Sequence, residues 1–493
     1  MSNPRPITVR VRGLPCEELL AGDIINGIIG INSRQLPEYH FSIVPTCDRE
    51  TEITALVEFP LGLPEFLLPL RTNPYGSQQF THDQELITFD RNFVGFTQLS
   101  TAEPAVVDVI AICGIDGHAY GSWQSKESPY PMWLRHFLPK DFPSCRIMTW
   151  GYSGKLARLD HAIIYDYARE FLEGLKRIRT GEARDRPIIF LAHSFGGIVL
   201  VRALLQAERS GISDQDLASL LESLLGIMFF AVPHGGMDLE DMSQITGSAD
   251  HPRVALLNHL RNNSEQLDAQ REAFRDFLYH RQSRSTSCKV ISFFETEQSP
   301  RLQQNENGEW ARSGDHCMPL TSNSAVLGLP SQMETCIPVH TDHSSIVKLN
   351  SRYDEAYGHI HHHFRTLLGL SPKPLSTRPS KPSPDDSLAL LIMTAKRTPS
   401  GLDLDPSSNT WRSAIGAAQS SGIGKVLMPM LLISAVATVS FVPNNNIVQW
   451  CWNKKKWGLW GIVVPVALYT ARYSFLEGDT ALTDDHVKTD LQD

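Results

Sequence analysis

Five short, almost uninterrupted apolar runs between residues 107 and 295 constrain the fold of this chain more than any other feature. Runs that lack the polar alternation of a half-exposed strand are typical of parallel strands covered by helices on both faces. Stretches with helical periodicity separate them, of which 157–179 and 195–208 are the clearest. The sequence therefore predicts an α/β fold with a mostly parallel sheet. The five runs are VDVIAIC (107–113), RIMTW (146–150), PIIFLAH (187–193), LGIMFFAV (225–232) and KVISFFE (289–295).

Residues 1–99 predict a separate small α+β module. Its expected order is β-α-β-β-α-β, which is the ferredoxin-like pattern that RNA-recognition modules share. Such modules stack bases on aromatic residues of two central strands, whereas Arg10, Thr54 and Leu56 occupy those positions here. The formal net charge of −9 also argues against nucleic-acid binding. We expect an accessory packing or interaction module. The predicted elements are strands 7–12, 41–45, 53–59 and 86–89 and helices 17–27 and 64–71.

The C-terminal third has three compositions in succession. A Pro/Ser-rich stretch, 371–424, cannot bury a core and predicts a linker after the domain at 100–370. Residues 425–475 contain two apolar runs, 426–443 and 457–471. Four tryptophans, two before the second run and two within it, cluster beside the lysines at 454–456. Apolar runs with an aromatic belt are typical of membrane segments. We expect a transmembrane region at 425–475, followed by an acidic tail at 476–493.

The cysteines and the first residues indicate the compartment. None of the eight cysteines forms a CxxC pair, so neither a zinc site nor a disulfide framework is predicted. The opening MSNPRPITVRV lacks the apolar core of a secretory signal peptide. We therefore expect an intracellular, membrane-associated protein, and both the endoplasmic reticulum and the mitochondrion fit this expectation. The sequence does not predict an oligomeric state.

The segment LAHSFGG (191–197) follows one of the five apolar runs and opens a predicted helix. A nucleophilic serine on a sharp strand-to-helix turn normally lies in Gly-x-Ser-x-Gly, because strand and helix approach closely there. Ala192 replaces the first glycine, but alanine is also small. Gly196 and Gly197 supply the more crowded side, where the helix departs. Ser194 is therefore the candidate nucleophile.

Three further features occur in the chain order of an α/β-hydrolase. Strand 107–113 ends in a glycine-rich turn at Gly114, so that the backbone N–H groups of Ile115 and Phe195 are candidate oxyanion donors. Glu295 ends the run KVISFFE and is the candidate acid, and His343 in IPVHTDHSSIVK is the candidate base. Alternatives remain at both positions. They are Glu297 and Asp315 for the acid and His340 for the base.

Residues 105–367 resemble the serine-esterase-like α/β-hydrolases, which are related to the serine active-site-containing protein and to inositol-deacylase/lipase-like hydrolases. The N-terminal module with FDRNFVGFTQL (89–99) resembles a segment of fungal members. The resemblance implies that Ser194, Glu295 and His343 are nucleophile, acid and base. The family usually has His-Gly where this chain has Cys113-Gly114. The stretches that carry the resemblance are ICGIDGHAYGSW (112–123), WLRHFLPKDFPSCRIMTWGYSG (133–154), LAHSFGGIVLVRALL (191–205), GIMFFAVPHGG (226–236), ISFFETE (291–297) and SAVLGLP…IPVHTDHSSIVKL (324–349).

These features predict a serine hydrolase that cleaves a carboxylic ester, with a lipid or acyl ester as substrate and no metal or organic cofactor. The alternative is a catalytically silent hydrolase-fold module for interaction or signalling. The pair His359 and His363 has metal-ligand spacing but no evident third ligand. His118, His193 and His234 are expected near the active-site end of the sheet. The helical segment 252–280 fits either a lid or a helix packed on the sheet.

Overall fold

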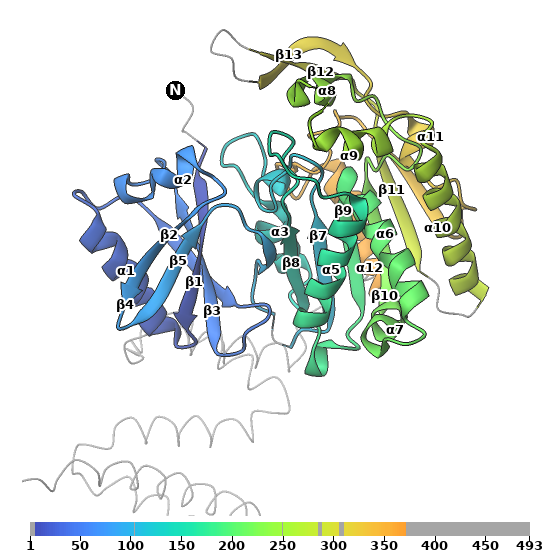
Figure 1. Ribbon diagram of the computed structural model, residues 1–493. Coiled ribbons are helices and arrows are strands. Elements are labelled where there is room, and N and C mark those ends of the chain that lie inside the picture. The colour runs from blue at the N-terminus through green and yellow to red at the C-terminus, as the bar shows by residue number, and fades with distance from the viewer. Residues whose placement is uncertain (1–4, 103, 249, 284–287, 305–309, 371–493) are drawn as a thin grey trace, which may run out of the picture. The chain divides into compact units, whose positions relative to one another are not determined.

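The main sheet of the protein has seven strands in the order β14-β11-β10-β9-β7-β8-β6. All neighbouring pairs are parallel except β6 and β8, which are antiparallel. The predicted α/β class with a mostly parallel sheet is therefore confirmed. The computed structural model describes residues 5–370 except 103, 249, 284–287 and 305–309 (Figure 1). The strands of the main sheet are β6 (Gly95–Gln98), β7 (Val107–Ile112), β8 (Cys145–Gly151), β9 (Ile188–His193), β10 (Leu224–Phe230), β11 (Lys289–Glu295) and β14 (Glu334–Val339).

The central strands of the main sheet are covered on both faces. Every residue of β7 and of β9 is buried, which explains why their sequences are continuously apolar. The five predicted runs correspond to β7, β8, β9, β10 and β11. The edge strands β6 and β14 have mixed sequences, GFTQ and ETCIPV, without an apolar run. The sequence pattern therefore indicates the centre of the sheet and misses its edges.

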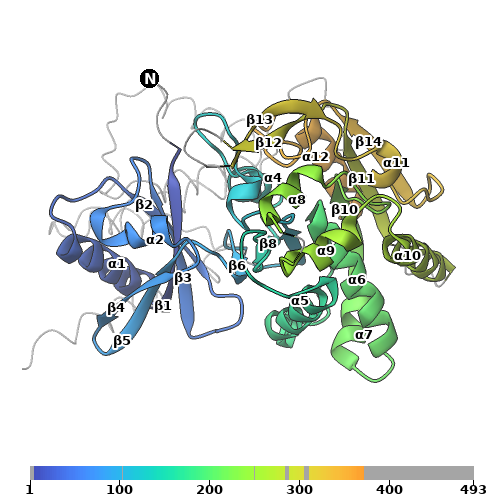
Figure 2. The same ribbon diagram turned by 45° about the horizontal axis from the view of Figure 1, so that its top comes forward.

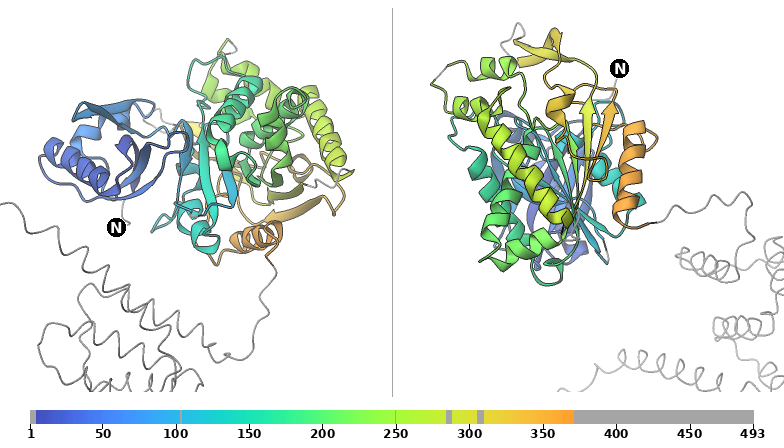
Figure 3. Two further views of the ribbon diagram at one scale, coloured as in Figure 1. Left: turned by 90° about the horizontal axis from the view of Figure 1, so that it is seen from below. Right: turned by 90° about the vertical axis from the view of Figure 1, so that its right-hand side faces the viewer.

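Helices cover the two faces of the main sheet. One face carries α5 (Ile164–Ile178), α6 (Phe195–Ser210) and α10 (Glu265–Ser283), and α12 (Glu355–Leu367) lies on the other face (Figure 3). Segment 252–280 forms α9 (Arg253–Leu260) and α10. Helix α10 packs against α6, where the Gln270 side-chain amide donates to the carbonyl of Ile198 at 3.0 Å. Helix α10 therefore covers the sheet rather than forming a lid.

Short elements complete this part of the chain. The hairpin of β12 (Ser299–Gln304) and β13 (Trp310–Cys317) lies beside α8 (Glu240–Thr246), beyond the end of β11 (Figure 2). The hairpin begins shortly after Glu295, the predicted acid, which ends β11. The remaining short helices are α3 (Trp133–His136), α4 (Leu138–Asp141), α7 (Gln215–Glu222), α11 (Ser322–Ala325), η2 (Gly121–Trp123) and η3 (Gly181–Ala183).

A second, five-stranded sheet lies N-terminal to the main sheet and has the order β2-β3-β1-β5-β4, with antiparallel neighbours. The predicted elements occur in the expected order, with the extra edge strand β4, whose polar sequence SQQFTH gives no apolar pattern. The predicted helix 64–71 is broken, because Pro69 lacks the N–H of a helix interior. The elements are β1 (Ile7–Pro15), α1 (Glu18–Asn32), β2 (His40–Pro45), β3 (Glu52–Phe59), η1 (Glu65–Leu67), α2 (Pro69–Thr72), β4 (Ser77–His82) and β5 (Glu85–Asp90).

Arg10 links this N-terminal sheet to the main sheet. Its side chain is almost fully buried and pairs with Asp90 at 3.0 Å. It also donates to the hydroxyl of Thr97 on β6 at 2.6 Å. The arginine that replaces an aromatic RNA-stacking residue in the sequence is therefore part of a buried ion pair within the N-terminal sheet, and its hydrogen bond to Thr97 reaches the main sheet.

The predicted linker and apolar tail, 371–493, lie outside the described residues. Among the residues that the structure does describe, no helix is both long and apolar enough to cross a membrane. The two apolar runs at 426–443 and 457–471 therefore stay a prediction from the sequence.

Candidate active site

Ser194 lies on a strained turn between β9 and α6. Its backbone has φ 50° and ψ −127°, a conformation that residues other than glycine rarely adopt and that costs about 1–3 kcal/mol. Two hydrogen bonds hold the turn. The Ser194 N–H donates to the carbonyl of Phe230 on β10, and the Ser194 carbonyl accepts from the N–H of Gly197, both at 2.9 Å. The strand-to-helix turn that the sequence predicts is therefore present.

The residues around Ser194 must be small for different reasons on the two sides. A methyl group on Gly196 would lie 2.4 Å from the carbonyl oxygen of Cys113, and one on Gly197 would lie 2.3 Å from a methyl carbon of Val232. On the strand side, Ala192 is fully buried between β7 and β10, and its methyl group is accommodated. Alanine at this position is therefore compatible with the turn, whereas the helix side requires glycine.

The two sides of the turn are expected to respond differently to exchange of alanine and glycine. Gly197→Ala forces a methyl group onto Val232, so we expect a loss of about 1–3 kcal/mol in the free energy of unfolding. Ala192→Gly restores the usual motif and should cost about 0.5–1 kcal/mol through backbone entropy. Urea denaturation of both variants measures the two losses.

Adding Val232→Ala to Gly197→Ala provides the control for this prediction. If the overlap with Val232 is the cause, the double variant regains most of the stability lost in Gly197→Ala, and the two substitutions couple by about 1 kcal/mol or more, on the order of other contacting pairs. Additive losses would contradict the explanation.

Ser194, His343 and Glu295 form a continuous hydrogen-bonded row. The His343 Nε2 atom lies 3.0 Å from the Ser194 Oγ atom, and its Nδ1 atom lies 2.8 Å from the Glu295 Oε1 atom. An ionised carboxylate only accepts hydrogen bonds, so Nδ1 carries the proton and Nε2 is left to accept from the serine hydroxyl. All three residues are at most 6% exposed. The row therefore lies in a low-dielectric environment, which strengthens its electrostatic interactions.

The backbone of His343 is fixed from both sides by residues that the sequence analysis did not assign to this role. The His343 N–H donates to the hydroxyl of Ser299 on β12 at 3.2 Å. Its carbonyl accepts from the Nε2–H of His193 at 3.0 Å. Burial is the main cause that holds the pKa of His193 well below its usual value, and the nearby His343 is the second. The His193 ring is therefore neutral. His193 and Ser299 therefore position the candidate base.

The alternative acids and bases lie elsewhere. Glu297 and Asp315 are exposed, and neither takes part in the hydrogen-bonded row. The exposed His340 faces the hydroxyl of Thr296 at 3.1 Å. The structure therefore brings Glu295 and His343 to Ser194 and leaves the alternatives outside.

The predicted oxyanion loop packs directly against the serine. A methyl group on Gly114 would lie 3.0 Å from the Ser194 Cβ atom, so a larger residue there would push against the serine. Among the described residues, the backbone N–H of Ile115 donates to no turn or loop carbonyl, nor does that of Phe195 at the first position of α6. The thiol of Cys113 is buried, which raises its pKa to about 12 and keeps it protonated. Cys113, which stands where the hydrolases that the sequence resembles usually have histidine, thus places an inert side chain beside the loop.

His118 fastens the same loop through both ring nitrogens. Its Nδ1 atom accepts from the N–H groups of Tyr120, at 3.1 Å, and Gly121, at 2.9 Å, and its Nε2–H donates to the carbonyl of Arg91 at 2.5 Å. Burial lowers the pKa of His118 to about 4. Protonation would place a hydrogen on the Nδ1 atom, which could then no longer accept from the N–H groups of Tyr120 and Gly121. His118 therefore has a structural role. His234, buried edge-on against Phe229, does not line the cavity at Ser194.

The His118 ring makes the fold sensitive to acid. The unfolded chain binds this proton near pH 6.5 and the folded chain only near pH 4, so the free energy of unfolding falls as the pH drops through this window. We expect His118→Gln to lose about 2 kcal/mol less than the wild type between pH 7 and pH 4.5. Urea denaturation at both pH values measures the difference. The exposed His161→Gln is the control, and equal losses in all three proteins would contradict the role given to His118.

Ser194 and His343 open onto a cavity of about 570 Å³, here called the Ser194 cavity. Its walls come from the loop 114–124, from Met242 of α8, from the segment around His343 and from the N-terminal residues 5–8. The cavity places the serine hydroxyl in reach of a small molecule.

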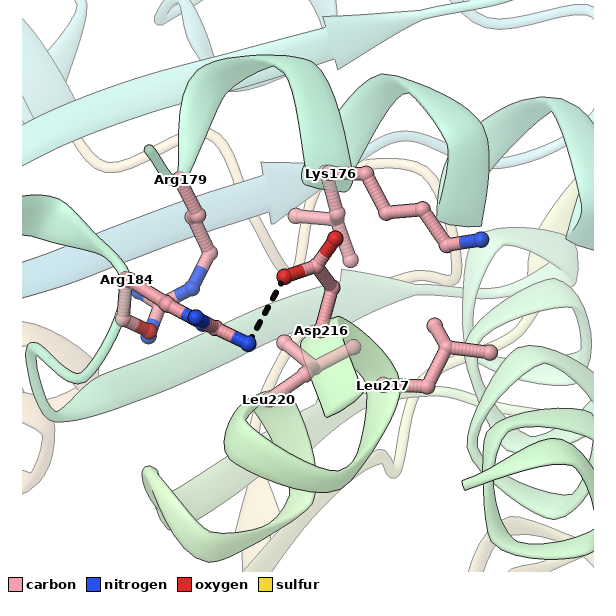
Figure 4. Close-up of a pocket in the computed structure, with 7 residues that line it drawn as sticks. Lys176, Arg179, Arg184, Asp216, Leu217 and Leu220 are labelled. Atoms are coloured by element: carbon pink, nitrogen blue, oxygen red, sulfur yellow. Dashed lines mark hydrogen bonds and ion pairs between the residues drawn. The ribbon is translucent and has the colours of Figure 1, made fainter. Parts of the chain in front are cut away.

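A much smaller cavity of about 10 Å³ lies between α5 and α7, where Arg184 pairs with Asp216 at 3.1 Å (Figure 4). Another of its lining residues, Arg179, pairs with Asp108 near the start of β7. Parallel strands β7 and β9 both end at the Ser194 side, so this cavity lies at the opposite end of the sheet. This cavity has room for about one water molecule, and none of the candidate catalytic residues lines it.

Comparisons with curated proteins find relatives that share part of the chain. Protein SERAC1 of Danio rerio is 27% identical over 226 residues, which are 42% of this chain and 33% of that protein. Protein SERAC1 of Mus musculus is 26% identical over 279 residues, 52% of this chain and 38% of that protein. The chain thus spans between a third and two fifths of the length of these relatives. No protein-family model matches the chain.

Comparison with solved structures aligns this chain with several hydrolases. The mature Bacillus licheniformis lipase BlEst2 aligns at 16% identity and a TM-score of 0.33, covering 55% of this chain and 97% of the lipase. YbtT, a type II thioesterase, aligns at 13% identity and a TM-score of 0.30, covering 55% and 98%. Phospholipase PlaB from Legionella pneumophila aligns at 15% identity and a TM-score of 0.33, covering 59% and 62%.

Proposed function

We propose that the protein is a serine hydrolase that cleaves a carboxylic ester through an acyl-enzyme on Ser194. The observation that carries this proposal is the unbroken row of Ser194, His343 and Glu295 at the wall of the Ser194 cavity. A serine hydroxyl is a poor nucleophile unless a base removes its proton, and the row supplies both a base and an anion that orients it.

Acylation begins when the Ser194 Oγ atom attacks the ester carbonyl carbon and its proton passes to the His343 Nε2 atom. The ionised Glu295 stabilises the imidazolium that forms. The carbonyl oxygen becomes an oxyanion, which the N–H groups of Ile115 and Phe195 are proposed to bind. When the tetrahedral intermediate collapses, the bond to the alcohol oxygen breaks and His343 returns its proton to the leaving alcohol.

Deacylation repeats these steps with water. His343 takes a proton from water, the hydroxide oxygen attacks the acyl carbon, and collapse of the second tetrahedral intermediate returns the proton to Ser194 and releases the carboxylic acid. Apart from water, no step of acylation or deacylation requires an oxidant, a reductant or another co-reactant.

The alternative function is a catalytically silent interaction or signalling module. The strained backbone at Ser194 favours the enzyme, because a positive φ at a serine costs free energy that a simple connecting turn would not need. The buried carboxylate of Glu295 also favours the enzyme. Its Oε2 atom has no hydrogen-bond partner among the described residues, and burial of such an atom costs free energy that a merely structural carboxylate would not need.

The substrate expected from the sequence is a lipid or another acyl ester. The lining of the Ser194 cavity is mixed: apolar side chains, among them Ile7, Ile115 and Met242, alternate with polar and charged residues and form no continuous apolar wall. This lining supports an acyl ester with a short chain more than a long-chain lipid, because a long chain needs an apolar wall. Attachment to an intracellular membrane through 425–475 is a separate proposal that rests on the apolar sequence alone.

A panel of p-nitrophenyl esters with acyl chains of two to sixteen carbons, together with phospholipid vesicles, tests this proposal. We expect p-nitrophenol release that shows an initial burst of one equivalent, and kcat/KM highest for the short chains. Turnover of long-chain esters or phospholipid at tenfold higher kcat/KM would contradict the short acyl chain but not the serine hydrolase. Absence of turnover on the whole panel would contradict the proposed activity.

A further inference from the structure

We propose that the N-terminal segment 5–8 and Arg91 form one wall of the substrate site, and that the guanidinium groups of Arg5 and Arg91 select an ester that carries an anionic group. This inference rests on the proposed ester hydrolysis at Ser194. It gives the N-terminal sheet a role in substrate recognition, where the sequence analysis expected only an accessory packing or interaction module.

The N-terminal segment lines the same cavity as the catalytic candidates. Arg5, Pro6, Ile7 and Thr8 share the Ser194 cavity with the serine itself. Strand β1 begins at Ile7, so the segment is continuous with the N-terminal sheet. The buried Arg10 bonds that strand to the main sheet through Thr97, and Asp90 on β5 holds its guanidinium in place. The wall is therefore attached to a rigid element rather than to a free chain end.

Neutral acceptors hold the Arg5 guanidinium in place. Its Nε–H donates to the side-chain oxygen of Gln124, and one Nη2–H donates to the carbonyl of Gly121, both at 3.2 Å. Gln124 is itself buried, which fixes the acceptor. Neither partner carries a negative charge, so the positive charge of Arg5 is oriented by these bonds and is not neutralised by them.

Arg91 contributes a second cation to the same wall. Its Nη1–H donates to the carbonyl of Leu70 at 3.1 Å, again a neutral acceptor. Burial lowers the pKa of Arg5 and of Arg91, but a guanidinium stays charged at any physiological pH. Within the described part of the chain, no carboxylate lies within ion-pair distance of either guanidinium.

The charge balance of the cavity favours an anionic ligand. The cations that line it are Arg5, Arg91 and Lys348, and its acidic lining residue is Asp116. Asp116 in turn lies 3.9 Å from the ammonium group of Lys155. Because the wall is partly desolvated, the positive charges of Arg5 and Arg91 attract an anion more strongly than they would in water. A carboxylate or phosphate matches the forked donors of a guanidinium.

The inference is tested by comparing esters that differ in one charge. On the acyl side, p-nitrophenyl hydrogen glutarate carries a carboxylate and p-nitrophenyl methyl glutarate does not. p-Nitrophenyl 3-phosphonopropanoate replaces the carboxylate by a phosphonate. On the alcohol side, 3-carboxy-4-nitrophenyl butyrate is compared with 4-nitrophenyl butyrate. We expect the wild type to prefer an anionic member of these sets, and the preferred member identifies both the anion and the side of the ester that the wall contacts.

Arg5→Gln is expected to lower the ratio of kcat/KM for the anionic ester to kcat/KM for its neutral partner by about ten- to a hundredfold, as expected for a hydrogen bond to a charged group. The ratio is the relevant readout, because loss of the bond to Gly121 also disturbs the loop at the serine. Arg5→Lys should retain part of the preference. The matched control is Arg34→Gln, an exposed arginine outside the cavity, which should leave the ratio unchanged.

A ratio that is the same in wild type and Arg5→Gln would overturn the inference, as would a wild-type preference for the neutral esters. Failure of the underlying function gives a different result, since no ester in the set would then be turned over. Should Arg5→Gln not fold, the Arg91→Gln variant carries the same test, because only its side chain is changed and its carbonyl still accepts from His118.

Discussion

Replacing Ser194 by alanine is expected to lower kcat for ester hydrolysis on the order of 10⁶-fold, because no other group forms the acyl-enzyme. The Ser194 Oγ atom is the one hydroxyl in contact with the His343 Nε2 atom among the described residues. Binding and the oxyanion donors remain in the variant, so a small residual rate over water is expected. Initial rates on a short p-nitrophenyl ester measure the effect.

The control for this variant is Ser213→Ala, which removes an exposed hydroxyl beyond the C-terminal end of α6, at the opposite end of that helix from Ser194. We expect its kcat to equal that of the wild type. The fold of Ser194→Ala is verified by its urea midpoint, since alanine has the same backbone preferences at this strained position. A folded Ser194→Ala variant that retains more than a tenth of the wild-type kcat would contradict the role of the serine.

Glu295→Gln is expected to lower kcat by about 10²- to 10⁴-fold, whereas Glu297→Gln should change it less than twofold. The neutral amide keeps the size of the side chain but removes the charge that stabilises the His343 imidazolium, and its NH₂ group can hold the ring in the wrong tautomer. Glu297 is exposed and lies outside the row, so its charge is screened by solvent.

The same kinetic assay measures both variants, and their ranking is the test. The opposite ranking would reassign the acid to Glu297. Equal small effects would mean that His343 needs no carboxylate for proton transfer, which would contradict the electrostatic part of the proposed mechanism.

The centre of the fold and the three candidate catalytic residues follow from local sequence patterns. A strand buried on both faces must be apolar along its length, so β7 and β9 are evident in the sequence. Parallel strands all end at one edge of a sheet, and this explains why Ser194, Glu295 and His343, far apart in the chain, could be expected to meet. The small-residue requirement at Ala192 is likewise local.

His193 is expected from the sequence near the active-site end of the sheet, but the roles of the supporting residues could not be predicted, because these roles depend on long-range contacts. Ser299 contacts the His343 backbone only because the hairpin β12–β13 folds back beside the end of β11, and no residue pattern marks that serine. His193 directly precedes Ser194, yet its hydrogen bond joins residues 150 positions apart. Arg5 reaches the Ser194 cavity through the packing of the N-terminal sheet, which composition and periodicity do not specify.

Labelling with a fluorophosphonate probe tests the central claim most directly, since the probe forms a covalent bond only with an activated serine. We predict that folded, detergent-solubilised wild-type protein incorporates one equivalent of probe and that mass spectrometry places it on Ser194, whereas Ser194→Ala incorporates none. Absence of labelling in folded wild-type protein, or labelling that persists in Ser194→Ala, would contradict the claim that Ser194 is the nucleophile.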